Sequence, residues 1–250
     1  MAVEDVYFSY SLAVLVTFAV VAYGVRLAMR GVARSERVAR IGGSALVGHE
    51  VMNWTYWAVD PIVRALVALG VTANGLTWSA LVLGAGAGVA VGFGWFGLAC
   101  VLGVASTIGD ILDGQVARLT NSGSSRGELL DAAIDRYTEF AFLAGLAFHF
   151  GATPWALAIV LAALLACVMV SYASAKAEAM QVAVPRGLMR RHERATYLLT
   201  GAGLTPMLAG VLRDRGLPVE LPVLVGLAII AVVGNAAAVT RLVRIGRALK

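Results

Sequence analysis

Four aspartates form the part of the chain whose residue types and spacing could do chemistry. Asp110 and Asp113 are three residues apart, and Asp131 and Asp135 are four residues apart. Either spacing is about one turn of an α-helix, so each pair presents two carboxylates from one face. The linker of residues 119–126 is rich in Asn, Ser and Gly, a composition that breaks helices. We therefore expect two helices that fold back on each other and bring all four carboxylates together.

The surroundings of these aspartates point to a bound cation. Residues 98–109 and 140–148 are almost wholly apolar, so the carboxylates lie at or just inside the end of a membrane-buried hairpin. Ionised groups are costly there and are usually functional. Arg118 and Arg136 can offset part of the negative charge. Clustered carboxylates otherwise suit hard divalent cations such as Mg²⁺, and two such ions would neutralise four aspartates.

The composition is that of a polytopic membrane protein. Hydrophobic residues make up 60% of the chain and charged residues only 14%. The net charge of +5 comes from basic residues spread over the segment ends, which favours contact with lipid phosphate and excludes a nucleic-acid surface. Cys100 and Cys167 both lie in apolar segments, where we expect them to pack without forming a disulfide or a zinc site.

Two helices are predicted ahead of the core. Residues 8–27 are long and apolar enough to span a bilayer. Arginines follow this segment and no cleavage site does, which indicates an uncleaved helix whose C-terminal end is cytoplasmic. Residues 45–69 are amphipathic and are interrupted by Pro61, so we expect them to lie along the membrane interface.

Six further spans are predicted to form the core. They cover residues 77–95, 97–118, 128–150, 154–178, 193–212 and 221–244. The predicted fold class is all-α, a polytopic membrane bundle of six core transmembrane helices with the extra N-terminal helix and the interfacial helix. We divide the chain into an N-terminal helix and basic linker over residues 1–44 and a membrane domain over residues 45–250.

The first core span contains four glycines, and the chain's basic residues are unevenly placed. Glycines in a membrane span let helices approach closely, and the Lys and Ser/Thr of a phosphate loop are missing here. Alternating spans place residues 119–126, 179–192 and the C-terminus in the cytoplasm, leaving only Arg213 and Arg215 outside. We therefore predict a site that faces the cytoplasm from the cytoplasmic membrane.

Eight residues around the aspartates form one longer motif. They are Asp110, Asp113, Gly114, Ala117, Arg118, Gly127, Asp131 and Asp135. Their spacing resembles the signature of the CDP-alcohol phosphotransferases, Asp-x2-Asp-Gly-x2-Ala-Arg-x8-Gly-x3-Asp-x3-Asp. Residues 70–77 also resemble the Gly-x-Thr-Pro-Asn-x-Leu-Thr stretch of that family, with Ala73 where proline is usual. The resemblance covers roughly residues 60–244 and leaves out the first helix.

The resemblance implies a reaction and a role for each aspartate. In that family the hydroxyl of an alcohol attacks a CDP-linked lipid at the phosphorus that bears the lipid, and CMP leaves. The family pattern makes Asp110, Asp113 and Asp131 ligands of Mg²⁺ or Mn²⁺, with Asp135 contributing to the same metal site. Two such ions can stabilise the attacking and leaving oxygens together. The pattern also assigns Asp135 as the general base.

The nucleotide is expected next to the first aspartate pair. Gly114 has no side chain and Ala117 a small one, so a nucleotide can approach the helix there. Arg118 matches the family's contact with the cytidine diphosphate, and a guanidinium suits phosphate. Ser124 stands where relatives often have a hydroxyl near the nucleotide.

The acceptor is indicated by a second resemblance, to the bacterial phosphatidylinositol-phosphate synthases within this family. Residues 171–179 resemble Ser-Tyr-x-Lys-Ala-Arg-Ala-Glu-Ala and residues 187–194 resemble Gly-x-x-x-Arg-x-Glu-Arg. The pattern implies an acceptor phosphate bound by basic residues. The candidate acceptor-binding residues are Ser171, Arg191, Arg194 and Arg241. Ser174 replaces a lysine of this branch, and Lys176 lies on a different side of the helix.

The predicted function is metal-dependent transfer of a phosphatidyl group from CDP-diacylglycerol to inositol phosphate, with release of CMP. Glycerol 3-phosphate or an unphosphorylated alcohol is the alternative acceptor. An ion transporter or a lipid-binding scaffold would be a different class, but transporters favour internal repeats, and the aspartate motif is not repeated. The expected partners are the two substrates and membrane lipids, and the family resemblance adds a homodimer.

Overall fold

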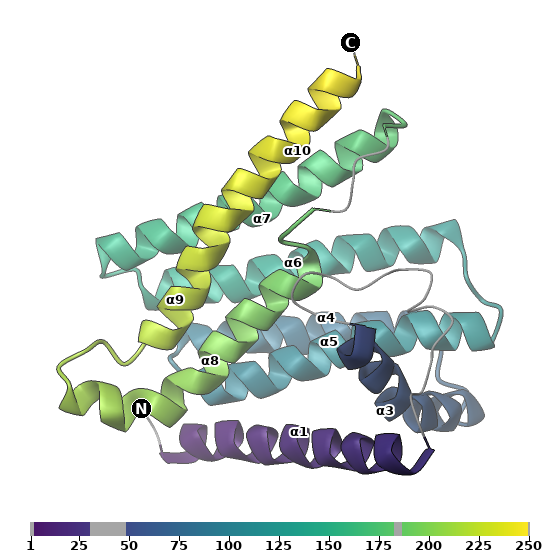
Figure 1. The fold of residues 1–250 in the computed structure, drawn as a ribbon, viewed down its shortest axis with the longest axis horizontal. Helices are drawn as coiled ribbons and strands as arrows, with labels where there is room; N and C mark the ends of the chain where they lie inside the picture. Colours follow the sequence, from purple (N-terminus) through teal and green to yellow (C-terminus); the bar gives the residue numbers. More distant parts are fainter. Residues whose placement is uncertain (1–2, 31–48, 183–186, 250) are drawn as a thin grey trace.

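The computed structural model describes residues 3–30, 49–182 and 187–249, and this part of the chain is a bundle of long α-helices (Figure 1). The core consists of α4 (Ala73–Gly92), α5 (Phe96–Leu119), α6 (Ser125–His149), α7 (Pro154–Ala179), α8 (Arg191–Asp214) and a last long helix. That last helix runs through α9 (Leu221–Ile229), the π-helical turn η1 (Ile230–Gly234) and α10 (Asn235–Ala248). Each of the six predicted core spans is thereby confirmed as a helix. The predicted domain boundary after residue 44, with Arg34, Arg37 and Arg40 ahead of it, lies outside the described residues.

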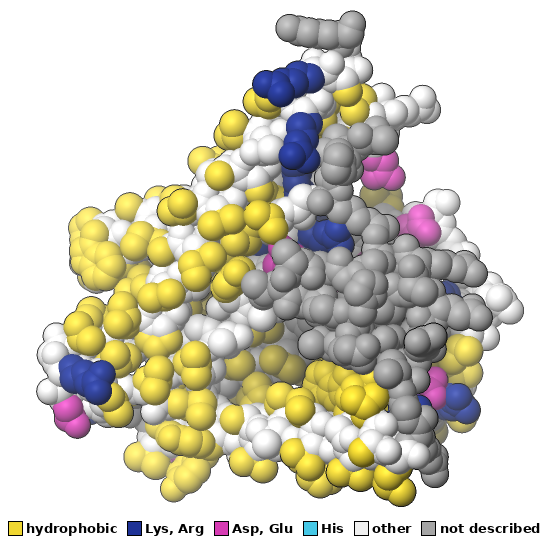
Figure 2. Space-filling view, viewed as in Figure 1, with side chains coloured by type: hydrophobic (Ala, Val, Ile, Leu, Met, Phe, Trp, Pro, Cys, Tyr) yellow, Lys and Arg dark blue, Asp and Glu magenta, His cyan; other side chains and the backbone are white. Residues whose placement is uncertain are grey.

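The helices have the dimensions and surface of membrane spans. Within the described ranges, α1 (Val3–Arg30), α4, α5, α7, α8 and the α9–α10 helix are each long and apolar enough to cross a bilayer. The 25-residue α6 has the same length but carries the charged residues of the predicted site. Hydrophobic side chains cover much of the described surface, with charged ones toward its extremities (Figure 2). The chain is an integral membrane protein.

Hydroxyl side chains cap the N-termini of α4 and α6, the helices before and after α5. Thr72 accepts a hydrogen bond from the Gly75 amide at the start of α4, and Ser124 accepts one from the Gly127 amide at the start of α6. Both are N-caps, which satisfy an amide that the helix itself leaves unpaired. Asn121 adopts a left-handed backbone conformation with φ of 51° between α5 and α6. The predicted reversal of direction at this linker is confirmed.

Helix α4 lies between the two helices that carry the aspartates. Both α5 and α6 pack along α4, whereas their own contacts in the described structure are few, so they do not fold directly against each other as the sequence suggested. The reason is the small-residue surface of α4. A methyl group at Gly88 would overlap the backbone of Ala141 on α6, and one at Gly145 would overlap the backbone of Gly88. The predicted packing role of the glycines is confirmed.

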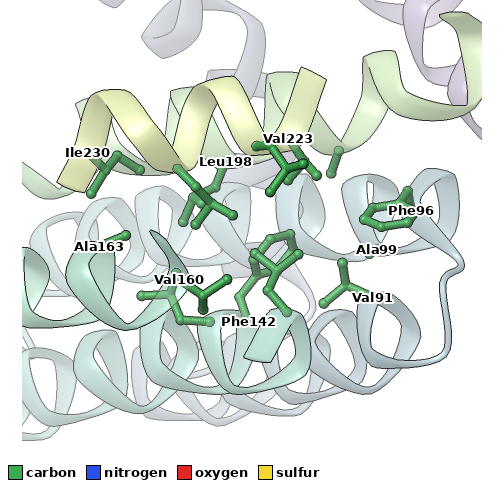
Figure 3. Close-up of a cluster of buried hydrophobic side chains, with 14 of the residues drawn as sticks. Val91, Phe96, Ala99, Phe142, Val160, Ala163, Leu198, Val223 and Ile230 are labelled. Carbon is green, nitrogen blue, oxygen red and sulfur yellow. The ribbon is translucent and has the colours of Figure 1, made fainter. Parts of the chain in front are cut away.

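An apolar core joins the helices beyond the site. Leu143, Leu146 and Leu227 are fully buried. The same cluster contains side chains from α4, α5, α6, α7, α8, α9 and η1, including Val91, Phe96, Phe142, Val160, Leu198, Val223 and Ile230 (Figure 3). Cys100 and Cys167 are buried free thiols in this cluster, as predicted. The core fixes the axes of the helices whose ends form the site.

Helix α1 is hydrogen-bonded to the core near its N-terminus. It packs on α5 and α8 along one side of the bundle (Figure 1). Asp5 is 1% exposed, and its Oδ1 accepts a hydrogen bond of 3.0 Å from the amide of Leu98. Leu98 lies in the first turn of α5, where Trp95 provides no side-chain cap. A carboxylate of α1 thus serves as the N-cap of α5.

Helix α3 (His49–Ala68) supports the other end of α5. Its Val59 and Val63 are buried against Leu112 and Val116, on the turns of α5 that carry the aspartates. The predicted interruption at Pro61 is wrong, because α3 is continuous through this residue. Proline removes one intrahelical hydrogen bond, and the buried valines on either side hold the helix in place.

Candidate active site

Three carboxylates meet where α5 ends and α6 begins. Asp110 and Asp113 of α5 and Asp131 of α6 each place one oxygen so that all three lie within 4.8 Å of one another. Asp113 is buried at 6% exposure, and Asp110 and Asp131 are half-buried. The predicted convergence is therefore present in the structure for three of the four aspartates.

Asp113 is held in place by a residue of α4. Its Oδ2 accepts a hydrogen bond of 2.6 Å from the hydroxyl of Thr77, which is itself buried. Thr77 ends the motif of residues 70–77, but no role was predicted for it. A threonine at that fixed place in the motif was the signal that could have found it.

Asp110 and Asp135 both contact the guanidinium group of one arginine. The Nη1 atom of Arg191, the first residue of α8, lies 2.7 Å from Oδ2 of Asp110 and 2.6 Å from Oδ1 of Asp135. Of the two arginines expected to offset the carboxylate charge, Arg136 forms a longer ion pair. Arg136 is half exposed and lies 3.9 Å from Asp135. The direct counter-charge comes from Arg191, which belongs to a distant segment of the chain.

The charge balance and one buried oxygen fit a divalent cation. Four carboxylates face this region, and their ion pairs with described arginines are those of Arg191 and, at 3.9 Å, of the half-exposed Arg136. Oδ1 of Asp131 is buried, and no described residue gives it a hydrogen bond. A buried polar atom is costly unless it has a partner. Carboxylate oxygens at this separation are the donor set that Mg²⁺ and Mn²⁺ prefer, so the residues fit such an ion.

The predicted nucleotide residues lie on the last turns of α5 and at the start of α6. Gly114 and Ala117 are half-buried, and Arg118 is exposed. A methyl group built on Gly114 would lie 3.4 Å from Nη1 of Arg118, so the guanidinium lies over the glycine. Ser124 is exposed and uses its hydroxyl to cap α6. Its nucleotide contact stays a prediction.

Arg194 is occupied by a buried ion pair. It is 2% exposed, and its Nε and Nη2 atoms bind the two carboxylate oxygens of Glu139 at 2.7 and 2.9 Å. Its Nη1 donates to the carbonyl of Met189 at 2.7 Å. The guanidinium therefore anchors α8 to α6, whereas the sequence predicted a direct contact with the acceptor. Glu139 was missed, although it follows Asp135 by one helical turn.

Arg241 joins α10 to the segment before α8. It is buried at 8% exposure and donates to the Ser174 hydroxyl at 2.8 Å and to the Leu188 carbonyl at 2.7 Å. Ser171 is half-buried on α7, one turn before Ser174. The candidate acceptor residues Ser171 and Arg241 thus come from neighbouring helices. Lys176 is exposed, in agreement with its expected position on another side of α7.

The backbone ahead of Arg191 is fixed from several sides. Glu193 is buried, and its Oε2 accepts from the amides of Met189 at 2.7 Å and Arg190 at 3.2 Å. Met189 has φ of 61°, a left-handed conformation that side chains other than glycine adopt rarely. Together with the bonds from Arg194 and Arg241, these contacts determine where α8 begins. They place Arg191 opposite the aspartates.

Comparison with known proteins gives consistent matches. A family model described as CDP-alcohol phosphatidyltransferase matches residues 70–240. A phosphatidylinositol phosphate synthase of Corynebacterium glutamicum is 33% identical over 154 residues, covering 60% of this chain and 70% of that protein. Crystal structures of Mycobacterium tuberculosis phosphatidylinositol phosphate synthase are 26% identical with a TM-score of 0.64. The structure with CDP-DAG bound covers 74% of this chain and 92% of that chain, and the complex with manganese and citrate covers 74% and 87%.

Proposed function

This chain belongs to the CDP-alcohol phosphatidyltransferase family, and we propose that it transfers the phosphatidyl group of CDP-diacylglycerol to inositol phosphate. The observation that carries the proposal is the cluster of Asp110, Asp113 and Asp131 at the end of the membrane helices. The names of the relatives support the same substrates, because those proteins are phosphatidylinositol phosphate synthases and one is seen with CDP-DAG bound. The products are phosphatidylinositol phosphate and CMP.

The aspartates are proposed to bind two divalent cations, Mg²⁺ or Mn²⁺. Asp110, Asp113 and Asp131 supply the clustered oxygens, and Asp135 completes the ligand set. When bound, such ions neutralise the diphosphate and stabilise the charge that develops on the attacking and leaving oxygens. The manganese in a structure of the Mycobacterium tuberculosis relative supports the proposal of a divalent metal ion.

The chain's own residues supply binding and proton transfer. Arg118 is proposed to bind the diphosphate, since its guanidinium lies over Gly114, where the absence of a side chain leaves room. Ala117 and Ser124 complete this nucleotide side. Asp135 is proposed to accept the proton of the acceptor hydroxyl as the general base. The loss of that proton makes the oxygen a nucleophile toward phosphorus.

The acceptor is proposed to lie on the side of α8 and α10. Arg191 is the candidate for direct contact with its phosphate, because its side chain is 30% exposed and faces the aspartates. Arg241 and Ser171 border the same region from α10 and α7. Arg194 is proposed to act through its bonds to Glu139 and Met189, which fix the start of α8.

The distribution of arginines supports an orientation. Arg190, Arg191 and Arg241 lie at the end of the bundle that carries the aspartates, and Arg213 and Arg215 lie at the other end of α8. By the positive-inside rule we propose that the site faces the cytoplasm from the cytoplasmic membrane. A cysteine at Ser122 should then be labelled from the cytoplasm and one at Asp214 from outside. The homodimer and the division at residue 44 stay predictions.

The experiment that tests the proposed function is an acceptor screen. Purified protein is given CDP-diacylglycerol and one of inositol phosphate, glycerol 3-phosphate, inositol or serine, and CMP release is measured. We expect release with inositol phosphate to exceed release with each other acceptor, and EDTA to abolish it. Faster release with glycerol 3-phosphate or an unphosphorylated alcohol would contradict the proposed acceptor. A complete lack of CMP release would contradict the reaction itself.

A further inference from the structure

One guanidinium nitrogen connects three helices at the site. Nη1 of Arg191 on α8 contacts Asp110 on α5 and Asp135 on α6, at 2.7 and 2.6 Å. The contact with Asp110 is a short, charge-assisted hydrogen bond, and the contact with Asp135 is an ion pair. Arg191 therefore binds two of the four carboxylates that the proposed function assigns to divalent cations.

A carboxylate oxygen in direct contact with a guanidinium attracts a metal ion less strongly, because the guanidinium offsets its charge and occupies space beside it. Oδ1 of Asp135 is buried and faces Arg191. The oxygens of Asp110, Asp113 and Asp131 that approach one another offer one cation position, so a second ion that binds Oδ1 of Asp135 meets the guanidinium of Arg191 there. We propose that Arg191 is an internal counter-ion that competes with the second divalent cation for Asp110 and Asp135.

The surroundings of Arg191 allow this exchange. Its side chain is 30% exposed, whereas Arg194 and Arg241 are buried and bonded to backbone carbonyls. The backbone of α8 is held by Glu193 and Arg194, so only the long side chain of Arg191 has to turn. A divalent ion carries twice its charge and has more coordination positions. The exchange therefore needs a side-chain rotation and no movement of a helix.

The released guanidinium acquires a new partner in this account. A site whose four carboxylates are neutralised by two divalent ions no longer attracts Arg191, and a phosphate monoester is the anion that a guanidinium binds best. Cation binding would therefore prepare Arg191 for the acceptor phosphate. This step rests on the proposed function and predicts that metal binds before the acceptor does.

The test measures Mn²⁺ binding to the full-length protein in detergent. Calorimetry and electron paramagnetic resonance both report the affinities. Arg191→Gln should strengthen the weaker of two Mn²⁺ affinities by about tenfold, because it removes a charge-assisted competitor. The stronger affinity should change by about twofold or less. Arg136→Gln is the matched control, since it removes an equal charge whose nitrogen is 3.9 Å from Asp135 and half exposed.

A second measurement separates competition from a general change in charge or folding. Without added metal, Arg191→Gln should lower the melting temperature, because Asp110 and Asp135 lose their partner; saturating Mn²⁺ should restore the wild-type value. The inference is wrong if Arg191→Gln leaves both affinities unchanged, weakens them, or strengthens them no more than Arg136→Gln does. Wild-type protein that binds no Mn²⁺ at all would instead contradict the proposed metal site, which distinguishes the two failures.

Discussion

The hydroxyl of Thr77 on α4 lies 2.6 Å from a carboxylate oxygen of Asp113 on α5, and both side chains are buried. This contact orients a proposed metal ligand from the helix that separates α5 and α6. A hydrogen bond to a buried carboxylate is worth about 1.5 to 3 kcal/mol. Thr77 therefore belongs to the site, although it carries no charge and is not one of the eight motif residues around the aspartates.

Replacement of Thr77 tests this relationship. Thr77→Val keeps the shape of the side chain and removes the donor, so we expect CMP release to fall by about tenfold or more. Thr77→Ser keeps the hydroxyl and should retain most of the activity. Thr107→Val is the control, since that hydroxyl bonds only to the carbonyl of Gly103 in its own helix. Equal activity of the Val and Ser variants at position 77 would contradict the assigned role.

The buried pair of Arg194 and Glu139 gives a prediction about stability. Breaking such a pair by changing one partner typically costs about 3 to 5 kcal/mol. We expect Arg194→Gln and Glu139→Gln each to lower the melting temperature in detergent, and the double variant to lose clearly less than the sum of the two. Calorimetry of the four proteins forms the double-mutant cycle.

The same variants separate anchoring from acceptor binding. If Arg194 acts by fixing the start of α8, Glu139→Gln should change the kinetics in the same direction as Arg194→Gln. A rise of tenfold in the KM for inositol phosphate in Arg194→Gln, with unchanged stability and with normal kinetics in Glu139→Gln, would show instead that Arg194 contacts the acceptor.

Local sequence patterns predicted most of the fold. Hydrophobic length predicted the spans, and the glycines of α4 indicated close packing. The separation of α5 and α6 by α4 could not be predicted in this way. It depends on which helices share the small-residue surface of α4, and that is a property of the whole bundle.

The site could be predicted only in part for the same reason. Periodicity brings Asp110 next to Asp113 and Asp131 next to Asp135, but Arg191 is 81 residues from Asp110 in the chain. Helical periodicity predicts contacts between residues three or four apart, and it cannot predict one between residues so far apart in sequence. Arg194 was predicted to bind the acceptor, yet its partner is Glu139, and that contact is defined by the packing of α8 on its neighbours.

The hydrogen bond between Asp5 and the Leu98 amide predicts that α1 contributes to the stability of the core. Asp5→Ala leaves the Leu98 amide without its buried acceptor and should cost about 1 kcal/mol, the usual effect of losing an N-cap. Asp5→Asn keeps an acceptor oxygen and should lose less. Glu4→Ala, at an exposed position in the same turn, is the control. Thermal unfolding in one detergent compares the variants, and a melting temperature for Asp5→Ala equal to that of Glu4→Ala would exclude the capping role.

The most direct test of the account is CMP release from CDP-diacylglycerol and inositol phosphate by Asp131→Asn, measured at saturating Mn²⁺. This variant keeps the shape of the side chain and removes a charge from the carboxylate cluster. We predict a loss of about a thousandfold, as expected when several kcal/mol of transition-state stabilisation disappear. Asp60→Asn, whose exposed carboxylate pairs with Arg64 on α3, should retain full activity. Wild-type rates in Asp131→Asn, in protein that inserts and folds normally, would contradict the metal-dependent mechanism.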